Sequence, residues 1–324
     1  MAKKICCAIA LGSLCSLSAM SATQDPEKKL TKAAIEDAVR DLKGVELTLW
    51  DHAGVKTDGS STVVRGDGTV VQSWTPYYPI SPEEKTSTRR FRLALSPEEV
   101  RGILRLFAVD EVLALPKTRP DLAGVRETRF TLSLSISGVG SFEGEHPNID
   151  WSKLPQSPAA RELIRKIRSS VQELADRVAR EDEKVLANDR LLRRTDGFAL
   201  ELWDVHGLWG GESVRVHADG RVEGISVDRG VQVRHFKGTV EKGRVAGILK
   251  KAAELGTFDL KPKRQNGIPD EARPILGVQA TIDGATYSRS VALWEGEVRE
   301  TPAFQQVRQE LQAVASELLK QMGK

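Results

Sequence analysis

An internal repeat constrains the fold of this 324-residue chain more than any other feature. The segment 47–54, LTLWDHAG, aligns with the segment 200–207, LELWDVHG. Six further matches follow in the same order: Asp67-Gly68 with Asp219-Gly220, Phe91 with Phe236, 102–104 with 247–249, Leu115 with Leu260, 132–136 with 278–282, and Pro158-Ala159 with Pro302-Ala303. We therefore expect two tandem modules, 45–176 and 198–324, joined by a helical connector over 177–197.

The hydrophobic pattern of each copy predicts an α+β module. Leu47 and Leu49 alternate with polar residues, which is typical of a half-buried strand. The Asp-Gly pairs at 67–68 and 219–220 predict hairpin turns. Ser96 is a helix N-cap, and an amphipathic helix closes each copy. The sum is an antiparallel sheet of about five to six strands with two helices packed on one face.

Each module is also expected to begin with a short helix. The N-terminal segment 23–44 contains a helical pattern around 33–42. The stretch 185–193 stands in the matching place before the second copy. The connector would then belong in part to the second module.

Residues 1–22 have the order of a secretory signal peptide. Lys3 and Lys4 precede an apolar run over 5–17, and small residues follow over 18–22. The run is too short for the ~20 residues that a membrane-spanning helix needs. We therefore predict cleavage near 19–22 and a secreted or periplasmic product, soluble and with no membrane span after cleavage.

The signal segment also changes the composition of the mature chain. It holds all three cysteines, so the mature chain would have no thiol for a disulfide, a nucleophile or a metal. Removing Lys3 and Lys4 leaves 46 basic against 45 acidic residues. This balance leaves no excess of positive charge of the kind that nucleic-acid binding requires.

The two copies share scaffold residues and not reactive ones. Trp50 and Asp51 match Trp203 and Asp204, whereas none of the five histidines matches a histidine in the other copy. We interpret the two tryptophans as core or strand-edge residues. A metal site formed by His206, His217 and Asp204 is disfavoured, because these residues lack a fixed ligand spacing. We predict no catalytic residues, no metal and no cofactor.

One segment of the second copy stands out as a candidate binding site. His206, Trp209, Gly210 and Gly211 lie between two expected strands. An aromatic residue beside flexible glycines is suited to contact a partner. The alternative, that Trp209 caps one end of the sheet, has equal weight.

The second copy resembles emfourin-type domains and related uncharacterised bacterial secreted domains. The similar residues are Gly210, Gly211, Phe258, Asp259, Leu260 and Asp270, and the first copy keeps Leu115. The likeness covers most of each module through short motifs. Emfourin-type proteins inhibit thermolysin-like metalloproteases, so the resemblance implies a protein partner, a secreted or envelope protease.

Three functions are ranked on these grounds. The first is an exported, non-enzymatic protein-binding protein. The second is a structural spacer of the cell envelope. The third is a hydrolase that uses loop carboxylates such as Asp121 and Asp270.

Overall fold

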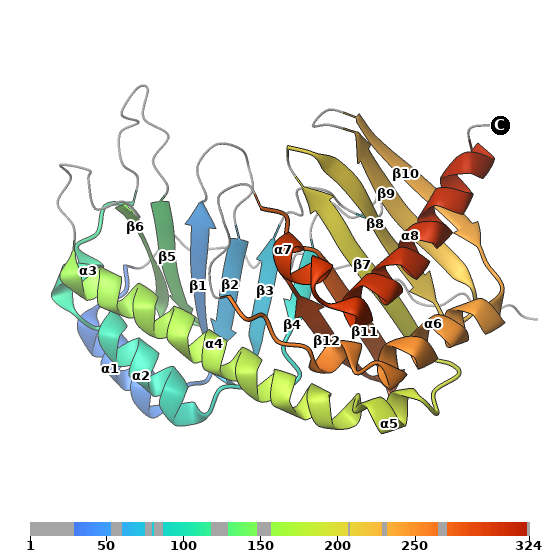
Figure 1. The fold of residues 1–324 in the computed structure, drawn as a ribbon. Helices are drawn as coiled ribbons and strands as arrows, with labels where there is room; N and C mark the ends of the chain where they lie inside the picture. Colours follow the sequence, from blue (N-terminus) through green and yellow to red (C-terminus); the bar gives the residue numbers. More distant parts are fainter. Residues whose placement is uncertain are drawn as a thin grey trace, which may run out of the picture.

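The computed structural model describes residues 29–52, 60–74, 80, 87–117, 129–147, 157–206, 208–228, 232–264 and 271–322. They form two six-stranded antiparallel sheets, each with its own helices (Figure 1). The two-module α+β fold is therefore confirmed. The expected signal peptide, Asp121 and Asp270 lie outside the described residues. No helix in the described parts of the chain is both long and apolar enough to cross a membrane.

The first module has the strand order β4-β3-β2-β1-β5-β6. Its elements are α1 (Lys32–Arg40), β1 (Val45–His52), β2 (Ser60–Arg65), β3 (Val70–Trp74), β4 (Ser87–Arg90), α2 (Pro97–Phe107), α3 (Asp110–Leu113), β5 (Arg129–Ile136), β6 (Gly140–Pro147) and α4 (Pro158–Val185). Ser96 caps α2 as predicted: its Oγ accepts from the backbone N–H of Glu99, and the Glu99 carboxylate accepts from the N–H of Ser96.

The second module has the equivalent order, β10-β9-β8-β7-β11-β12. Its elements are α5 (Asn188–Leu191), β7 (Phe198–His206), β8 (Gly210–His217), β9 (Arg221–Asp228), β10 (Gln232–Thr239), α6 (Lys242–Glu254), η1 (Thr257–Asp259), β11 (Ile275–Ile282), β12 (Ala285–Ala292), α7 (Glu295–Arg299) and α8 (Pro302–Met322). Both predicted Asp-Gly turns are present, with φ of 82° at Gly68 and 90° at Gly220.

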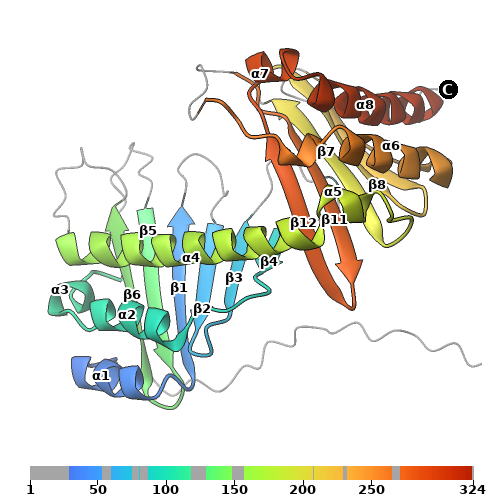
Figure 2. The same ribbon diagram turned by 60° about the horizontal axis from the view of Figure 1, so that its bottom comes forward.

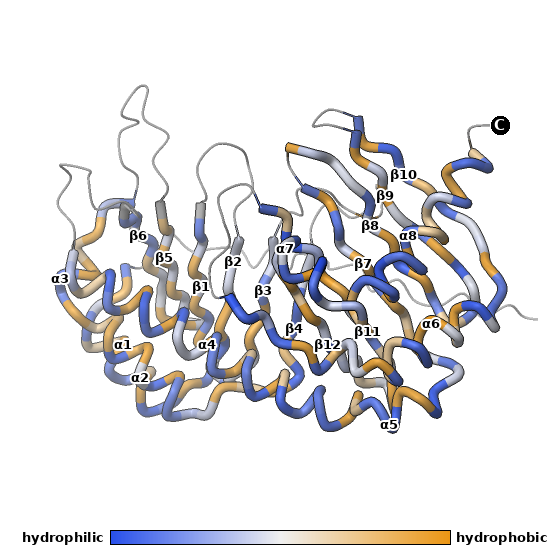
Figure 3. Tube along the Cα trace, in the orientation of Figure 1, coloured by the Kyte–Doolittle hydropathy of each residue, from blue (hydrophilic) through white to orange (hydrophobic). Residues whose placement is uncertain are grey.

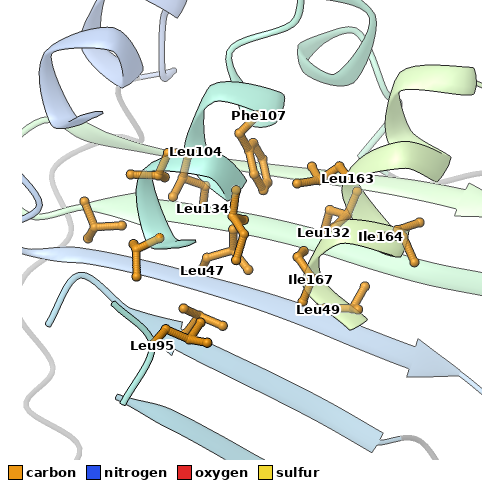
Figure 4. Packing of buried hydrophobic residues seen from close by; sticks show 14 of the residues in the cluster. Leu47, Leu49, Leu95, Leu104, Phe107, Leu132, Leu134, Leu163, Ile164 and Ile167 are labelled. Atoms are coloured by element: carbon orange, nitrogen blue, oxygen red, sulfur yellow. The ribbon is translucent and has the colours of Figure 1, made fainter. Parts of the chain in front are cut away.

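In each module the helices cover one face of the sheet (Figure 2). In the first, Leu47, Leu134 and Leu163 are among the buried residues that join β1, β5 and α4 (Figure 4). Hydrophobic and hydrophilic residues alternate along α4 and α8, as a helix with one buried face requires (Figure 3). The closing helices are amphipathic, as expected, and each buries one face: Leu163, Ile167, Val171 and Leu174 in α4, and Val307, Leu311, Ala315 and Leu318 in α8.

The interpretation of the two tryptophans is wrong. Leu49 is buried beneath the helices, and Trp50 is 44% exposed on the opposite face. Successive side chains of a strand point to opposite faces, so a Trp next to a core Leu faces away from the core. Trp203 is half-buried on the same open face of the second sheet. Both residues lie on the central strands β1 and β7, so neither anchors a sheet edge.

Strand pairing corrects the alignment of the copies at β5 and β11. Leu49 pairs with Leu132, and its counterpart Leu202 pairs with Leu276. Leu132 therefore corresponds to Leu276 and not to Val278, which is two residues further on. The β11–β12 hairpin extends beyond the point where its counterpart turns.

The two phenylalanines at the edge strands are not equivalent either. The N–H of Phe91 donates to the carbonyl of Val70, whereas the matching residue Val222 pairs with Gly238. Phe91 thus corresponds to Gly238, and Phe236 lies two residues earlier. Both phenylalanines are buried, because a shift of two residues keeps a side chain on the same face.

Helix α4 runs without a break through the boundary expected between 176 and 177. Its hydrophobic face continues there, since Val178 is buried. The first expected leading helix is present as α1, which packs on α2. The second, expected over 185–193, is a single turn, α5, which packs on α6, because Val185 still belongs to α4. The connector therefore consists of the end of α4 and the leading helix of the second module.

The last turns of α4 join the two modules. Asp182 is 3% exposed and accepts from Arg92 of the first module at 2.7 Å and from the backbone N–H of Ser288 of β12 at 3.1 Å. Arg92 also bonds to Glu181 at 2.7 Å and lies over the ring of Tyr287. One buried carboxylate is thus shared between the modules.

Candidate functional site

The four predicted site residues meet at the tip of the β7–β8 hairpin. His206 is the last residue of β7 and pairs with Gly210, the first residue of β8. Val205 pairs with Gly211 one rung further down. The residues that the sequence pointed to are therefore brought together by local hairpin pairing.

Gly211 is required by the backbone of this hairpin. Its φ is +130°, which L side chains rarely adopt. A Cβ at this position would lie 2.0 Å from the carbonyl oxygen of Asp204. Gly210 also has a positive φ, 75°. Gly211 thus permits the close approach of the two strands at the base of the tip.

The side chains of the tip are apolar and exposed. Leu208 is 55% exposed and Trp209 is 67% exposed. The His206 ring stacks on the indole with centroids 6.3 Å apart and planes 20° apart. The Nδ1 atom of His206 accepts from the backbone N–H of Leu208 at 3.2 Å. The alternative that Trp209 caps the sheet is wrong, because most of its surface faces solvent.

A buried polar cluster holds the base of the hairpin against the helices. One carboxylate oxygen of Asp204 accepts from Arg308 Nε at 2.7 Å and from Gln312 Nε2 at 2.9 Å, both on α8. Arg308 also donates to Glu295 of α7 at 3.0 Å. The helical partners were not identified from the sequence, because they lie about a hundred residues from Asp204 and form no local motif.

Two carboxyl groups of this region titrate above their ordinary range. Burial raises the pKa of Asp204, although the bonds from Arg308 and Gln312 act in the opposite direction. Burial also raises the pKa of Glu212, and the negative charge of Asp204 on the neighbouring strand adds to the effect. The hairpin base therefore contains acids whose ionised forms are disfavoured in the folded state.

The first module explains why both copies keep this aspartate. Asp51 bonds to Arg168 of α4 at 2.5 Å, as Asp204 does to Arg308 of α8. In each copy the aspartate ties the central strand to the closing helix. These strand-to-helix bonds give both aspartates the same structural role.

The disfavoured metal site does not form. His206 lies at the tip of the β7–β8 hairpin, whereas His217 pairs with Ala199 at the other end of the same strands. Among the residues that the structure describes, no group of three or more His, Cys, Asp or Glu side chains is placed to hold a metal ion.

Comparisons with known proteins leave the family open. No protein-family model matches the chain, and no curated protein matches it. The H. pylori beta clamp in complex with diflunisal is 7% identical, with a TM-score of 0.12, over 83% of this chain and 64% of the clamp. A Pseudomonas aeruginosa DnaN sliding clamp (DNA polymerase III subunit beta) bound to griselimycin is 11% identical, with a TM-score of 0.12, over 82% and 63%. The chain thus spans less than two thirds of either clamp, and a TM-score of 0.12 does not indicate a shared fold.

Proposed function

We propose that this chain is an exported, non-enzymatic protein that binds another secreted or envelope protein through the tip of the β7–β8 hairpin. The observation that carries the proposal is the exposure of Leu208 and Trp209 next to the close pairing of β7 and β8. Tryptophan is enriched among the residues that dominate binding energy at protein interfaces.

The tip is suited to enter an apolar pocket of a partner. Stacking on His206 restricts the Trp209 ring before any partner arrives. Pairing of Val205 with Gly211 and of His206 with Gly210 holds the strand ends on either side of Leu208 and Trp209. A preorganised contact loses less conformational entropy on binding than a mobile loop does.

The partner we propose first is a secreted protease of the thermolysin-like metalloprotease class. The resemblance of the second copy to emfourin-type domains supports this choice. The hairpin glycines Gly210 and Gly211 are among the residues that carry that resemblance.

The test is a titration of the mature chain against secreted thermolysin-like metalloproteases, with complex formation measured by calorimetry and inhibition by residual activity. We expect Trp209→Ala to weaken the complex about 30-fold, as the loss of an interface Trp worth about 2 kcal/mol would. Trp74→Ala is the matched control, since Trp74 is also exposed (41%) but belongs to the first module. Equal binding by the Trp209→Ala variant would contradict the proposal. A complex with a different secreted protein would keep the binding role and remove the protease.

A second candidate, a structural envelope spacer, is favoured by the junction between the modules. Asp182 and Arg92 hold the modules together through buried contacts. A spacer depends on this fixed geometry and not on the tip. An envelope defect produced by Asp182→Ala but not by Trp209→Ala would favour the spacer over the binding protein.

A further inference from the structure

A second site lies at the opposite end of strands β7 and β8 from the hairpin tip. A hollow of about 460 Å³ opens there on the second sheet. Ala199 lies between its two sides; His217 and Arg221 line one of them, and Gln279 and Thr281 line the other. This volume is in the range of small-molecule sites in proteins.

The first module shows what fills the equivalent place. Glu46 on β1 pairs with Arg65 on β2, and their side chains form an ion pair at 3.1 Å. The corresponding pair in the second module is Ala199 and His217. His217 stands where the first module has Arg65, so an imidazole replaces the guanidinium. Ala199 stands where the first module has Glu46, so a methyl group replaces the carboxylate. The hollow thus occupies the place of a missing carboxylate.

The extended β11–β12 hairpin adds a polar wall to this place. Thr281 and Thr286 pair as a rung close to the turn of β11–β12. In the first module the chain turns after Ile136, before such a rung can form. Both threonines line the hollow, and their hydroxyl groups can donate or accept hydrogen bonds.

Charged side chains line the hollow, and most of them already face a carboxylate. Arg215 bonds to Glu201 at 3.4 Å and to Glu223 at 3.2 Å, and His217 Nε2 lies 3.5 Å from the same Glu223 carboxylate; neither glutamate lines the hollow. Arg221 donates its Nε atom to Asp219, which does line the hollow. Arg221 makes no hydrogen bond through its Nη atoms to the described part of the chain.

We propose that this hollow binds a carboxylate group, which would take the place that the Glu46 side chain holds in the first module. Arg221, Gln279, Thr281 and Thr286, which line the hollow, supply the donors. The carboxylate can come from a small organic acid or from an acidic side chain of a peptide. The hollow does not include the hairpin tip, so carboxylate binding can be tested independently of the proposed protein binding.

The test uses the mature full-length chain and three probes: succinate, N-acetylglutamic acid α-amide, and the uncharged N-acetylglutamine α-amide. Binding is followed by NMR shifts of the backbone amides of Ala199 and His217. We expect the two carboxylates to bind at least about tenfold more tightly than the amide. Tighter binding of succinate would indicate a small acid as the source, and tighter binding of the glutamate probe a peptide side chain.

Ala199→Glu is the decisive variant, because it should rebuild the ion pair of the first module and occupy its own site. We expect it to weaken carboxylate binding at least about tenfold while the melting temperature stays within a few degrees of wild type. Thr48→Glu adds the same charge to the first sheet and should not affect binding. Arg221→Gln is a second variant: it removes the guanidinium donors and adds no bulk that could fill the hollow. No binding by either carboxylate, equal binding by the glutamine probe, or unchanged binding by Ala199→Glu or Arg221→Gln would overturn the proposal.

Discussion

Replacing Asp182 with alanine removes the side chain that ties the two modules together. Asp182 is 3% exposed, so water cannot readily replace the bonds that are lost. The backbone N–H of Ser288 loses its acceptor, which costs about 1 kcal/mol because Ser288 itself is exposed. Arg92 loses one of its two carboxylate partners but keeps Glu181 and is 24% exposed, so this part is about 1 kcal/mol. We therefore expect a loss of about 2 kcal/mol.

The assay is urea unfolding followed by tryptophan fluorescence, with small-angle scattering on the folded protein. The wild-type modules should unfold as one unit, and the Asp182→Ala transition should separate into two, because the modules no longer stabilise each other. Asp176→Ala is the matched control: Asp176 lies on the same helix, is exposed, and accepts from Gln172 alone among the described residues. A loss below about 1 kcal/mol with one unchanged transition would refute this account of the junction.

Four further substitutions and the N-terminal sequence of the recovered protein test other features of the molecule. In urea unfolding, Arg308→Ala should cost about 3 kcal/mol, because it leaves the Asp204 carboxylate, 8% exposed, without its cation. Arg168→Ala should cost about 1 kcal/mol or less, because the Asp51 carboxylate is 26% exposed. Equal losses would contradict this. Gly211→Ala should cost about 2 kcal/mol or more, since its methyl group would lie 2.0 Å from the Asp204 carbonyl oxygen; an unchanged stability would show that the turn relaxes freely. Burial raises the pKa of Glu212 above 4.5, so the stability it contributes is present below that value and is lost as the pH rises through the folded pKa. Glu212→Gln should therefore be more stable than wild type near pH 7 and equal to it near pH 4, as urea titrations at about these two pH values would show. Protein recovered from the medium or periplasm should begin near residues 20–23 by N-terminal sequencing, and an uncleaved N-terminus would contradict export through a signal peptide.

Much of the fold could be predicted because the chain contains the module twice. The Asp-Gly turns could be checked against their copies and are confirmed, as is the helix cap at Ser96, which the first copy alone carries. These features depend on neighbouring residues, so local sequence determines them. The equal strand order of the two sheets follows from the duplication.

Sequence similarity could not give the strand register. Leu132 and Phe91 were matched with residues two positions away from their true counterparts. A shift of two preserves both the hydrophobic alternation and the buried face, so the residue pattern does not distinguish the alternatives. Only the hydrogen-bond pairing to the neighbouring strand identifies them.

A candidate site could be predicted from the sequence where its residues are neighbours in the chain, and not where they come from distant elements. His206, Trp209 and the two glycines are adjacent in sequence, and local pairing brings them together. The partners of Asp204, Arg308 and Gln312, lie on the distant helix α8. The hollow at Ala199 is formed by side chains of five strands, β7, β8, β9, β11 and β12. Neither could be found without the tertiary structure.

The most direct test of the proposed binding role is photo-crosslinking from the hairpin tip in cells that produce the protein. A photoreactive amino acid is placed at position 209, and at position 74 as the control, since both native tryptophans are exposed. We predict a covalent adduct with a secreted or envelope protein from position 209 alone, identified by mass spectrometry. Absence of an adduct from position 209, or the same adducts from both positions, would contradict the claim that the hairpin tip is the binding site.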